Sequence, residues 1–480
     1  MISIKKRLLS FALIALCFAG IFRTAQDTYT SEADDGAVPV ADTADPKTTL
    51  IIWYADEMLG DYLEREAVAF GQASDDVRVL PVQVSGLNFF ETLGEASVKN
   101  IDFPDLYITT HDNLEKAALS GLAGTVDHPE DFLRGDNYPQ SALSAVTWHG
   151  DAVAYPFYGE TTALLYNRTY LEDEAKQRAE EAGEPVPDGD ELDELVADML
   201  PDTLTELLDF AGHYNAPEEV ESVFSFDVGD LFTDFFFAGD AINVGGENGD
   251  DKSVVDVYNV NSLTCLDIYQ QLGQFFSTSA DETDGEKVLA DFIAGKTVFT
   301  ISTTDAVRKL AEAMESDECS YEFGAVPLFD LTDDIETRAL SVTSCVVVNG
   351  FSEHQEQANR FARFLTEEGA QDMYERTGKM PARRRASYGE NEIISDMMTA
   401  YFRDYETSVP MPKMIETSNY WIRLEIAFAD IWGGAGVNDT MRGVAGQLMS
   451  QITGSATMPD RIDDPPRILL SQDIPEDSAE

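Results

Sequence analysis

Short apolar runs alternate with amphipathic stretches from Lys47 onward. Residues 49–54 combine β-branched and aromatic side chains, which is typical of a buried strand, and a helical pattern follows at 58–73. The same order then repeats: strand 77–84, helix 89–99, strand 104–108 and helix 112–120. This order predicts a parallel sheet covered by helices, whose ligands gather beyond the carboxyl ends of the strands. The loops at 55–58 and 109–113 are therefore candidate binding loops.

A second α/β region is predicted further along the chain. Residues 157–167 are strand-like but interrupted near Gly159 and Glu160, which indicates a hinge. An alternating region from 201 to about 341 follows, and we expect the phenylalanines at 235–237 to fill its interior. The segment 171–200 is acidic with little apolar periodicity, so we expect a solvated helical insertion there.

The two ends of the chain differ from the rest. Three basic residues at 5–7 precede an apolar run at 8–22 that is short for a membrane span, which indicates an export signal. Residues 1–23 are thus a cleaved signal peptide or a retained N-terminal anchor. Residues 24–46 contain few apolar side chains and are expected to be a disordered tether. The acidic, proline-containing tail at 454–480 either wraps a lobe or forms a loose end.

The charge balance excludes one class of partner. Asp and Glu number 89 against 32 Lys and Arg, which gives a formal net charge of −57. Nucleic-acid binding requires clustered basic side chains, so we expect no nucleic-acid partner. The chain is nevertheless 44% hydrophobic, enough to build a packed core rather than an acidic disordered chain.

The familiar catalytic and cofactor-binding signatures are missing from the sequence. No HExxH, GxxxxGK[ST], GxSxG or GxGxxG occurs. The four cysteines are widely scattered, without the paired spacing of a zinc site or redox motif. The oxygen-rich stretches at 188–193 and 248–251 do not fit the EF-hand spacing. We therefore expect no cofactor and no metal, and we interpret both stretches as solvated turns.

Ten stretches between residues 47 and 452 carry a resemblance by their order and spacing, although none is specific alone. They are Leu-Ile-Ile-Trp at 50–53, Phe-Pro-Asp-Leu-Tyr-Ile-Thr-Thr-His-Asp at 103–112, Ala-Tyr-Pro-Phe-Tyr-Gly-Glu at 154–160, Leu-Leu-Tyr-Asn-Arg at 164–168, Pro-Asp-Thr-Leu-Thr-Glu at 201–206, Phe-Ile-Ala-Gly-Lys-Thr-Val-Phe-Thr-Ile at 292–301, Val-Asn at 348–349, the helix at 358–365, Thr-Gly-Lys-Met-Pro-Ala at 377–382 and Asn-Tyr-Trp at 419–421. Together they resemble the extracellular solute-binding proteins of carbohydrate ABC importers, the family of maltose-binding protein.

This resemblance implies an α/β fold of two lobes, a periplasmic-binding-protein-like clamp with a hinge, in which each lobe is a sheet flanked by helices. Lobe 1 would comprise 47–158 with 345–390, and lobe 2 would comprise 159–340 with 391–453. The implied function is to bind a sugar, in particular an oligosaccharide, and to deliver it by hinge closure to the membrane permease of an ABC importer. The protein would be a monomer outside the cytoplasm, attached to the cell surface or secreted, and not an enzyme.

The resemblance also assigns candidate sugar-binding residues, because sugars are held by aromatic ring faces and by planar hydrogen-bonding groups. They are Asp56, Glu57, Asp112, Glu160, Asp230, Phe232, Asp305, Tyr420 and Trp421. Trp421 is interpreted as an aromatic platform, against the alternative that it packs in the core at the start of a helix. Trp53 is expected to be buried, and His111 to be a polar residue at a strand end.

Four positions depart from the maltose-type pattern and leave the sugar open. Met58 stands where that pattern has Lys, Thr109 where it has an aromatic residue, Asn113 where it has Arg, and Asp305 where it has Trp.

Two other functions remain open from the sequence. A secreted glycosidase would use two cleft carboxylates as acid and as nucleophile or base. A surface carbohydrate-binding module without transport would suit the tether at 24–46 equally well. Analysis of oligosaccharide products would reveal the glycosidase, and neighbouring permease genes would separate an importer component from the module.

Overall fold

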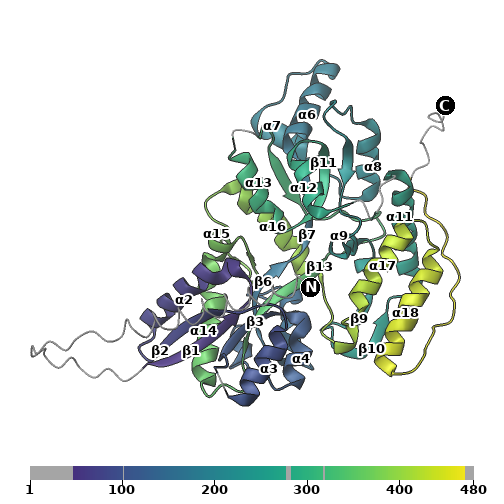
Figure 1. Cartoon of the computed structure of the whole chain (residues 1–480). Helices are drawn as coiled ribbons and strands as arrows, with labels where there is room; N and C mark the ends of the chain where they lie inside the picture. The colour runs from purple at the N-terminus through teal and green to yellow at the C-terminus, as the bar shows by residue number, and fades with distance from the viewer. Residues whose placement is uncertain (1–46, 101, 277–279, 281–282, 317–318, 471–480) are drawn as a thin grey trace, which may run out of the picture. The chain divides into compact units, whose positions relative to one another are not determined.

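The computed structural model describes residues 47–100, 102–276, 280, 283–316 and 319–470, whose contacts join them into one unit (Figure 1). The expected signal peptide or anchor, the tether and residues 471–480 of the tail lie outside this described part. Within it, no helix combines the length and the apolar character needed to cross a bilayer.

The larger of two main sheets confirms the β-α-β-α-β order predicted near the start of the chain. Its strand order is β14-β6-β13-β3-β1-β2, with β15 paired to β13. The strands are β1 (Thr48–Tyr54), β2 (Val77–Gln83), β3 (Leu106–Thr110), β6 (Tyr155–Glu160), β13 (Leu340–Val348), β14 (Met380–Pro381) and β15 (Val409–Pro410). β1 is parallel to both β2 and β3, whereas β13 is antiparallel to β3 and β6. The sheet is therefore mixed, and the predicted parallel arrangement holds for β2, β1 and β3 but not for β6, β13 and β14.

Helices from both ends of the described chain accompany this sheet. They are α2 (Gly60–Ala73), α3 (Phe89–Lys99), α4 (Leu114–Leu119), α5 (Gln140–Val146), α14 (Gln355–Glu367) and α15 (Met373–Thr377). The buried residues of α2 recur at helical spacing, and its Phe70 ring lies 5.2 Å from Phe361 of α14. Trp53 of β1 is buried, as predicted from its strand.

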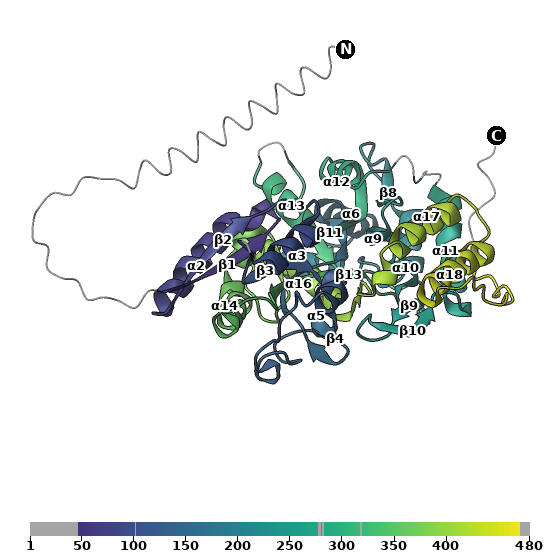
Figure 2. The same cartoon turned by 60° about the horizontal axis from the view of Figure 1, so that its bottom comes forward.

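The smaller main sheet has the order β12-β7-β11-β8. Its strands are β7 (Thr162–Asn167), β8 (Ser222–Ser225), β11 (Thr297–Thr303) and β12 (Phe323–Val326). The helices of this region are α6 (Arg168–Ala182), α7 (Gly189–Ala197), α8 (Leu204–His213), α9 (Leu231–Asp234), α10 (Phe236–Gly239), α11 (Val260–Phe276), α12 (Gly285–Ile293), α13 (Ala306–Met314), α16 (Glu392–Thr407), α17 (Tyr420–Trp432) and α18 (Val437–Thr453). α11, α17 and α18 pack against one another (Figure 2).

Two small antiparallel pairs complete the strands. They are β4 (Thr147–Trp148) with β5 (Asp151–Ala152), and β9 (Asn243–Gly245) with β10 (Asp251–Asp256).

The chain passes between the two main sheets where the sequence predicts an interruption. β6 ends at Glu160 and β7 begins at Thr162. Thr161 between them is buried, and its hydroxyl donates to the Leu340 carbonyl at 2.9 Å, where β13 starts. Gly159 is required just before this point, because a Cβ there would lie 2.6 Å from the Tyr405 ring.

The helical character expected at 171–200 is confirmed by α6 and α7, but the expectation that this segment is not a core element is wrong. α6 and α7 are acidic on their exposed faces, yet Leu171, Ala175, Leu192 and Val196 are buried in the same core cluster as Leu164 of β7. These few apolar positions are enough to attach both helices to the smaller sheet. The phenylalanines at 235–237 are buried in this cluster, as predicted.

The described part of the acidic tail wraps the second region rather than hanging loose. Asn438 of α18 donates to the Ile462 carbonyl at 3.0 Å, and Gln271 of α11 donates to the Ile468 carbonyl at 2.7 Å. Leu470 is buried in the core cluster. Up to residue 470, the first of the two alternatives holds.

Candidate functional site

Three of the predicted site residues follow or end strands, and their carboxylates converge on one ammonium group. Asp56 follows β1, Glu160 ends β6 and Asp305 follows β11. The Nζ of Lys379 lies 3.5 Å from Asp56 Oδ2, 3.4 Å from Glu160 Oε1 and 3.6 Å from Asp305 Oδ1. Side chains from both main sheets therefore meet at Lys379.

Local backbone structure fixes the position of Lys379. α15 ends at Thr377 and is capped by Gly378, whose φ of +71° belongs to the left-handed region that glycine adopts readily. The Lys379 amide then donates to Thr377 Oγ1 at 3.0 Å, and β14 begins at the next residue. Because Met380 pairs with Gly159 of β6, Lys379 lies beside Glu160.

The lysine of this cluster is less exposed to solvent than each of its three carboxylate partners. The Lys379 side chain is 11% exposed, whereas those of Asp56, Glu160 and Asp305 are 30%, 36% and 57% exposed. The ammonium thus lies behind the carboxylates. Each carboxylate has four lone-pair directions, so accessible directions remain for further hydrogen-bond donors.

Burial and neighbouring charge act in opposite directions on these groups. Burial lowers the pKa of Lys379, but Glu160, Asp305, Tyr158 and Asp56 together raise it above its ordinary value. Burial raises the pKa of Glu160, Lys379 lowers it, and Asp305 raises it again. We conclude that Lys379 is a cation at neutral pH and that it opposes protonation of Glu160.

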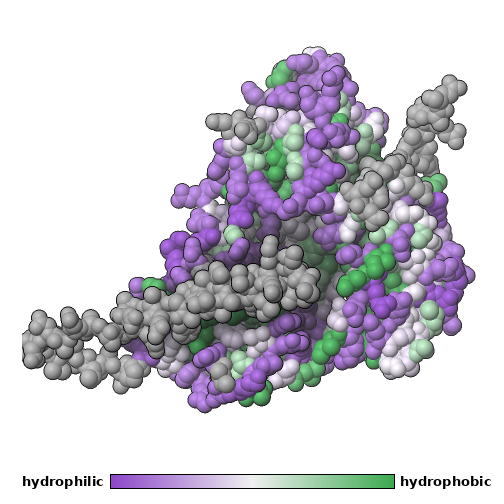
Figure 3. All heavy atoms as spheres, in the orientation of Figure 1, coloured by the Kyte–Doolittle hydropathy of each residue, from purple (hydrophilic) through white to green (hydrophobic). Residues whose placement is uncertain are grey.

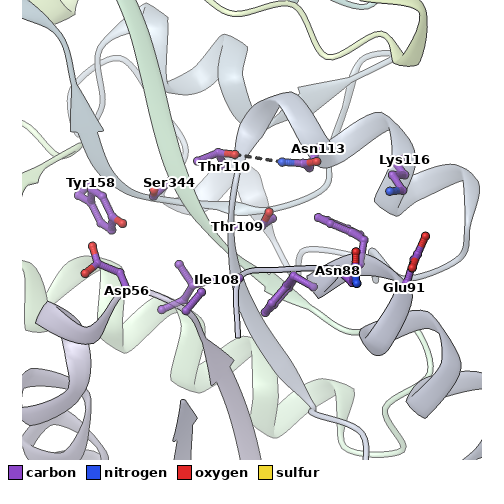
Figure 4. Close-up of a pocket in the computed structure, with 14 residues that line it drawn as sticks. Asp56, Asn88, Glu91, Ile108, Thr109, Thr110, Asn113, Lys116, Tyr158 and Ser344 are labelled. Atoms are coloured by element: carbon purple, nitrogen blue, oxygen red, sulfur yellow. Dashed lines mark hydrogen bonds between the residues drawn. The ribbon is translucent and has the colours of Figure 1, made fainter. Parts of the chain in front are cut away.

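A pocket of about 450 Å³ adjoins Asp56 at the carboxyl ends of β1 and β3 (Figure 4). Phe89, Phe90 and Ile108 give it apolar surface, and Asn88 adds an amide. Burial raises the pKa of Tyr158, which also lines the pocket, to about 12, so its phenol remains protonated at neutral pH. Apolar rings combined with a few fixed polar groups suit a small polyhydroxylated ligand.

Two of the four departures from the maltose-type pattern line this pocket. They are Thr109 and Asn113, and the Asn113 amide donates to Thr110 Oγ1 at 3.0 Å and to Asp112 Oδ1 at 3.3 Å. Asp112 thus lies at the pocket's edge. On the surface, Figure 3 shows hydrophilic side chains over much of the face drawn and a hollow near its middle.

A second group of candidates lies on α9 and α17, which pack against each other. Asp230 caps α9 by accepting from the Phe232 amide at 2.9 Å. The Trp421 ring lies 6.0 Å from Phe235, and Trp421 is half-buried. Trp421 therefore packs partly against the core, and its role as an aromatic platform stays a prediction. Glu425 lies one turn further along α17 and is exposed. Its pKa is raised mainly by partial burial and in addition by the nearby charge of Asp230.

The structure thus separates the sequence-predicted residues into two groups and leaves three apart, one of which is Asp112, the acceptor for Asn113. Asp56, Glu160 and Asp305 share Lys379, while Asp230, Phe232 and Trp421 lie on α9 and α17. Glu57 is exposed in the short 3-10 helix after Asp56. Tyr420 is 1% exposed in the core, where burial raises its pKa.

Sequence reasoning missed three residues: Lys379, Tyr158 and Glu425. Lys379 and Tyr158 lie within stretches that carried the resemblance, yet single lysines and tyrosines are too common to be selected by type alone. Spacing gave a signal for Glu425, since it is four residues after Trp421 and so on the same helix face.

The interpretation of the two oxygen-rich stretches as solvated turns is wrong for 188–193, which start a helix, and Asp250 of the other stretch is buried. Asp250 Oδ2 accepts from the His149 amide at 2.6 Å, and residues 189–193 open α7. Among the described residues, no group of three or more His, Cys, Asp or Glu side chains is arranged to hold a metal ion.

Several known proteins are similar to this chain. The family model described as bacterial extracellular solute-binding protein matches residues 68–397. A maltooligosaccharide ABC transporter solute-binding lipoprotein of Streptococcus pneumoniae is 22% identical over 79% of this chain and 83% of its own length. The maltodextrin-binding protein MdxE of Bacillus subtilis is 23% identical over 90% of this chain and 94% of its own length.

Solved structures show the same two-lobed fold. An extracellular solute-binding protein from Staphylococcus aureus in complex with maltose matches with a TM-score of 0.69 at 16% identity, over 85% of this chain and 99% of that one. A cyclo/maltodextrin-binding protein complexed with maltotetraose matches with a TM-score of 0.65 at 18% identity, over 86% of this chain and 98% of that one.

Proposed function

The chain belongs to the family of bacterial extracellular solute-binding proteins, and from this premise we propose that it binds an oligosaccharide and delivers it to an ABC importer. A maltooligosaccharide is the first candidate ligand, because relatives that match most of the chain are named for maltooligosaccharides and maltodextrin. The observation that carries the proposal is the convergence of Asp56, Glu160 and Asp305 beside a pocket with aromatic walls.

The chemistry of this arrangement suits an uncharged sugar. Carboxylate oxygens accept charge-assisted hydrogen bonds from hydroxyls, and these bonds are stronger than neutral ones. Aromatic faces cover the C–H patches of the ring, a role available to Trp421 and to the pocket phenylalanines. Asp230 and Glu425 would supply further acceptors beside Trp421.

Hinge closure would bring the two groups of residues onto one ligand. We assign 47–158 with 345–390 to one lobe and 159–340 with 391–453 to the other. Support comes from the break at Thr161 and from β13, which begins beside it. A ligand shifts such an equilibrium only by its differential affinity for the closed state, so contacts from both lobes are required. The permease of the importer would then recognise the closed form.

The protein would act as a monomer outside the cytoplasm. The basic residues and apolar run at 1–23 would direct export, and either an anchor or the tether at 24–46 would keep it near the membrane. This attachment would hold the loaded protein close to its permease.

A saccharide array tests the proposal. Thermal shift and calorimetry would be run with maltose, maltotriose, maltotetraose and cellotriose, and we expect a maltooligosaccharide to raise the melting temperature by linkage. Trp421→Ala should abolish both this shift and the ligand-induced change in tryptophan fluorescence. Trp421→Phe, which keeps a ring, is the matched control.

Two outcomes would count against the proposal. Retained affinity in Trp421→Ala removes the platform role, and absence of binding by every saccharide removes the function. Chromatography of the same mixtures after long incubation checks for cleavage, and shortened oligosaccharides would instead indicate a glycosidase.

A further inference from the structure

Lys379 is the unexpected feature of the candidate site, since the proposed sugar contacts are all carboxylates and rings. Its Nζ is nearly equidistant from three carboxylates, at 3.4 to 3.6 Å, and lies 5.6 Å from the centroid of the Tyr158 ring. Nζ donates a long hydrogen bond to Glu160 Oε1 and also lies within ion-pair distance of Asp56 and Asp305, so it is an electrostatic partner shared by three carboxylates.

The burial order shows which side of the cluster a ligand meets. With 11% exposure the Lys379 side chain is covered, while the three carboxylates are each exposed by 30% or more. A saccharide entering from the accessible side therefore reaches carboxylate oxygens first. Lys379 therefore affects the saccharide only through these carboxylates.

Without this cation the site would not be suited to neutral hydroxyls. Asp56, Glu160 and Asp305 repel one another, and a buried carboxylate relieves such repulsion by taking up a proton. A protonated carboxyl group loses one acceptor position and gains a donor, so it offers a hydroxyl a different pattern. The groups facing Lys379 are these three acids and Tyr158, and Arg308 of α13 lies by Gly378.

We propose that Lys379 is a positioning residue for saccharide binding: it holds the Asp56 and Glu160 carboxylates together and turned as hydroxyl acceptors without itself contacting the sugar. This inference rests on the proposed function and identifies the residue that positions the carboxylates of the same site. The Thr377-Gly378 turn and the pairing of β14 with β6 are the structural means by which the ammonium is held there.

The test compares Lys379→Met, Lys379→Arg and wild type, with the exposed Lys309→Met as the matched control for loss of a lysine. The affinity for maltotriose, or for the saccharide that binds best in the array, is measured by calorimetry at a series of pH values. We expect Lys379→Met to weaken binding about tenfold at neutral pH. Lys379→Arg should recover most of this loss, because it restores the cation.

The pH profile separates positioning from a merely structural role. Binding requires ionised Glu160, so affinity falls as the pH falls through the pKa of Glu160 in the empty protein. Lys379 lowers that pKa, so Lys379→Met should move the acid limb to higher pH, whereas Lys379→Arg should not. Asp305 raises the same pKa, and Asp305→Asn should move the limb to lower pH.

The outcomes are distinguishable. If wild type binds no saccharide, the proposed function fails and this inference fails with it. If wild type binds and Lys379→Met binds equally well with the same acid limb, only the inference fails. If Lys379→Met is poorly folded, Lys379→Gln takes its place, and an unmoved acid limb with unchanged affinity in that variant overturns the inference.

Discussion

Two covered lysines in the same chain have opposite electrostatic environments. Lys379 meets three carboxylates in the candidate site. Lys413 is fully buried, and its ammonium donates to two backbone carbonyls, that of Ser144 at 2.8 Å and that of Asn248. The first lysine is surrounded by full opposite charges and the second by dipoles.

The consequence is a difference in the sign of the pKa shift. Burial lowers the pKa of both lysines, but at Lys379 the four acidic neighbours outweigh it. At Lys413 burial dominates, Asp250 and Cys345 oppose it only in part, and the pKa falls to about 8. Burial alone therefore does not decide whether a lysine stays charged, because the nature of its partners does.

Lys413 connects segments of the backbone, whereas Lys379 contacts the side chains of the candidate site. Its bonds join residue 413 to α5 and to the turn before β10, and nearby His111 is buried between two strands' backbones. The His111 Nε2–H donates to the Met411 carbonyl at 2.8 Å, and Nδ1 accepts from the Thr343 amide at 3.0 Å. This second cluster is a structural junction with its polar groups paired internally.

The largest expected effect tests the lowered pKa of Lys413. Between about 8 and the ordinary 10.5 the unfolded chain holds a proton on this lysine that the folded chain lacks. Stability therefore rises with pH in this window, by roughly 3 kcal/mol. Urea unfolding across the window should show this rise in wild type and Lys309→Met but not in Lys413→Met. Parallel curves for all three proteins would contradict the assignment.

A similar effect of roughly 3 kcal/mol is expected on the acid side from His111. Burial and, to a lesser extent, nearby Lys413 lower its pKa from 6.5 to about 4, although Asp112 opposes them. The histidine is neutral in both states above 6.5, so its contribution is complete there and is lost as the pH falls toward 4. In urea unfolding between pH 6.5 and 4, His111→Gln should lack this part of the loss in the free energy of unfolding. The control His128→Gln, at an exposed position, should retain it.

A smaller change is expected in binding from Glu160→Ala, which removes an acceptor of the proposed site. We expect the binding free energy for the saccharide to become less favourable by about 2 kcal/mol, while the free energy of unfolding stays nearly unchanged. Calorimetry and urea unfolding measure the two quantities, and the exposed Glu286→Ala is the control. If the empty protein loses as much stability as the complex, Glu160 is structural.

The smallest expected effect is on stability at Lys379. Its carboxylate partners are partly solvated, so Lys379→Met should change the free energy of unfolding at neutral pH by less than about 1 kcal/mol. Because its pKa is raised, its contribution is complete below 10.5 and is lost as the pH rises further, opposite in sign to Lys413. A loss at neutral pH as large as the Lys413 effect would break the contrast.

Local elements followed from the sequence because their causes are local. The helix Phe89–Lys99 has the predicted bounds, and strand Thr48–Tyr54 differs by one residue, since both rest on apolar periodicity. Strand ends predicted the loop that holds Asp56, because such sheets bind ligands beyond the carboxyl ends of their strands. The choice of Asp56, Glu160 and Asp305 as site residues came from the family resemblance. The prediction that 171–200 lies outside the core was wrong, because a few apolar positions are sufficient to pack its helices against the core.

Tertiary structure alone decided how those residues meet. Lys379 and Glu160 are 219 positions apart, and only the pairing of β14 with β6 brings them together. The same holds for Lys413, whose type and neighbours in sequence do not distinguish it from an exposed lysine. Sequence pattern records which side of an element is buried, whereas charge and pKa depend on groups that distant segments place within a few ångströms.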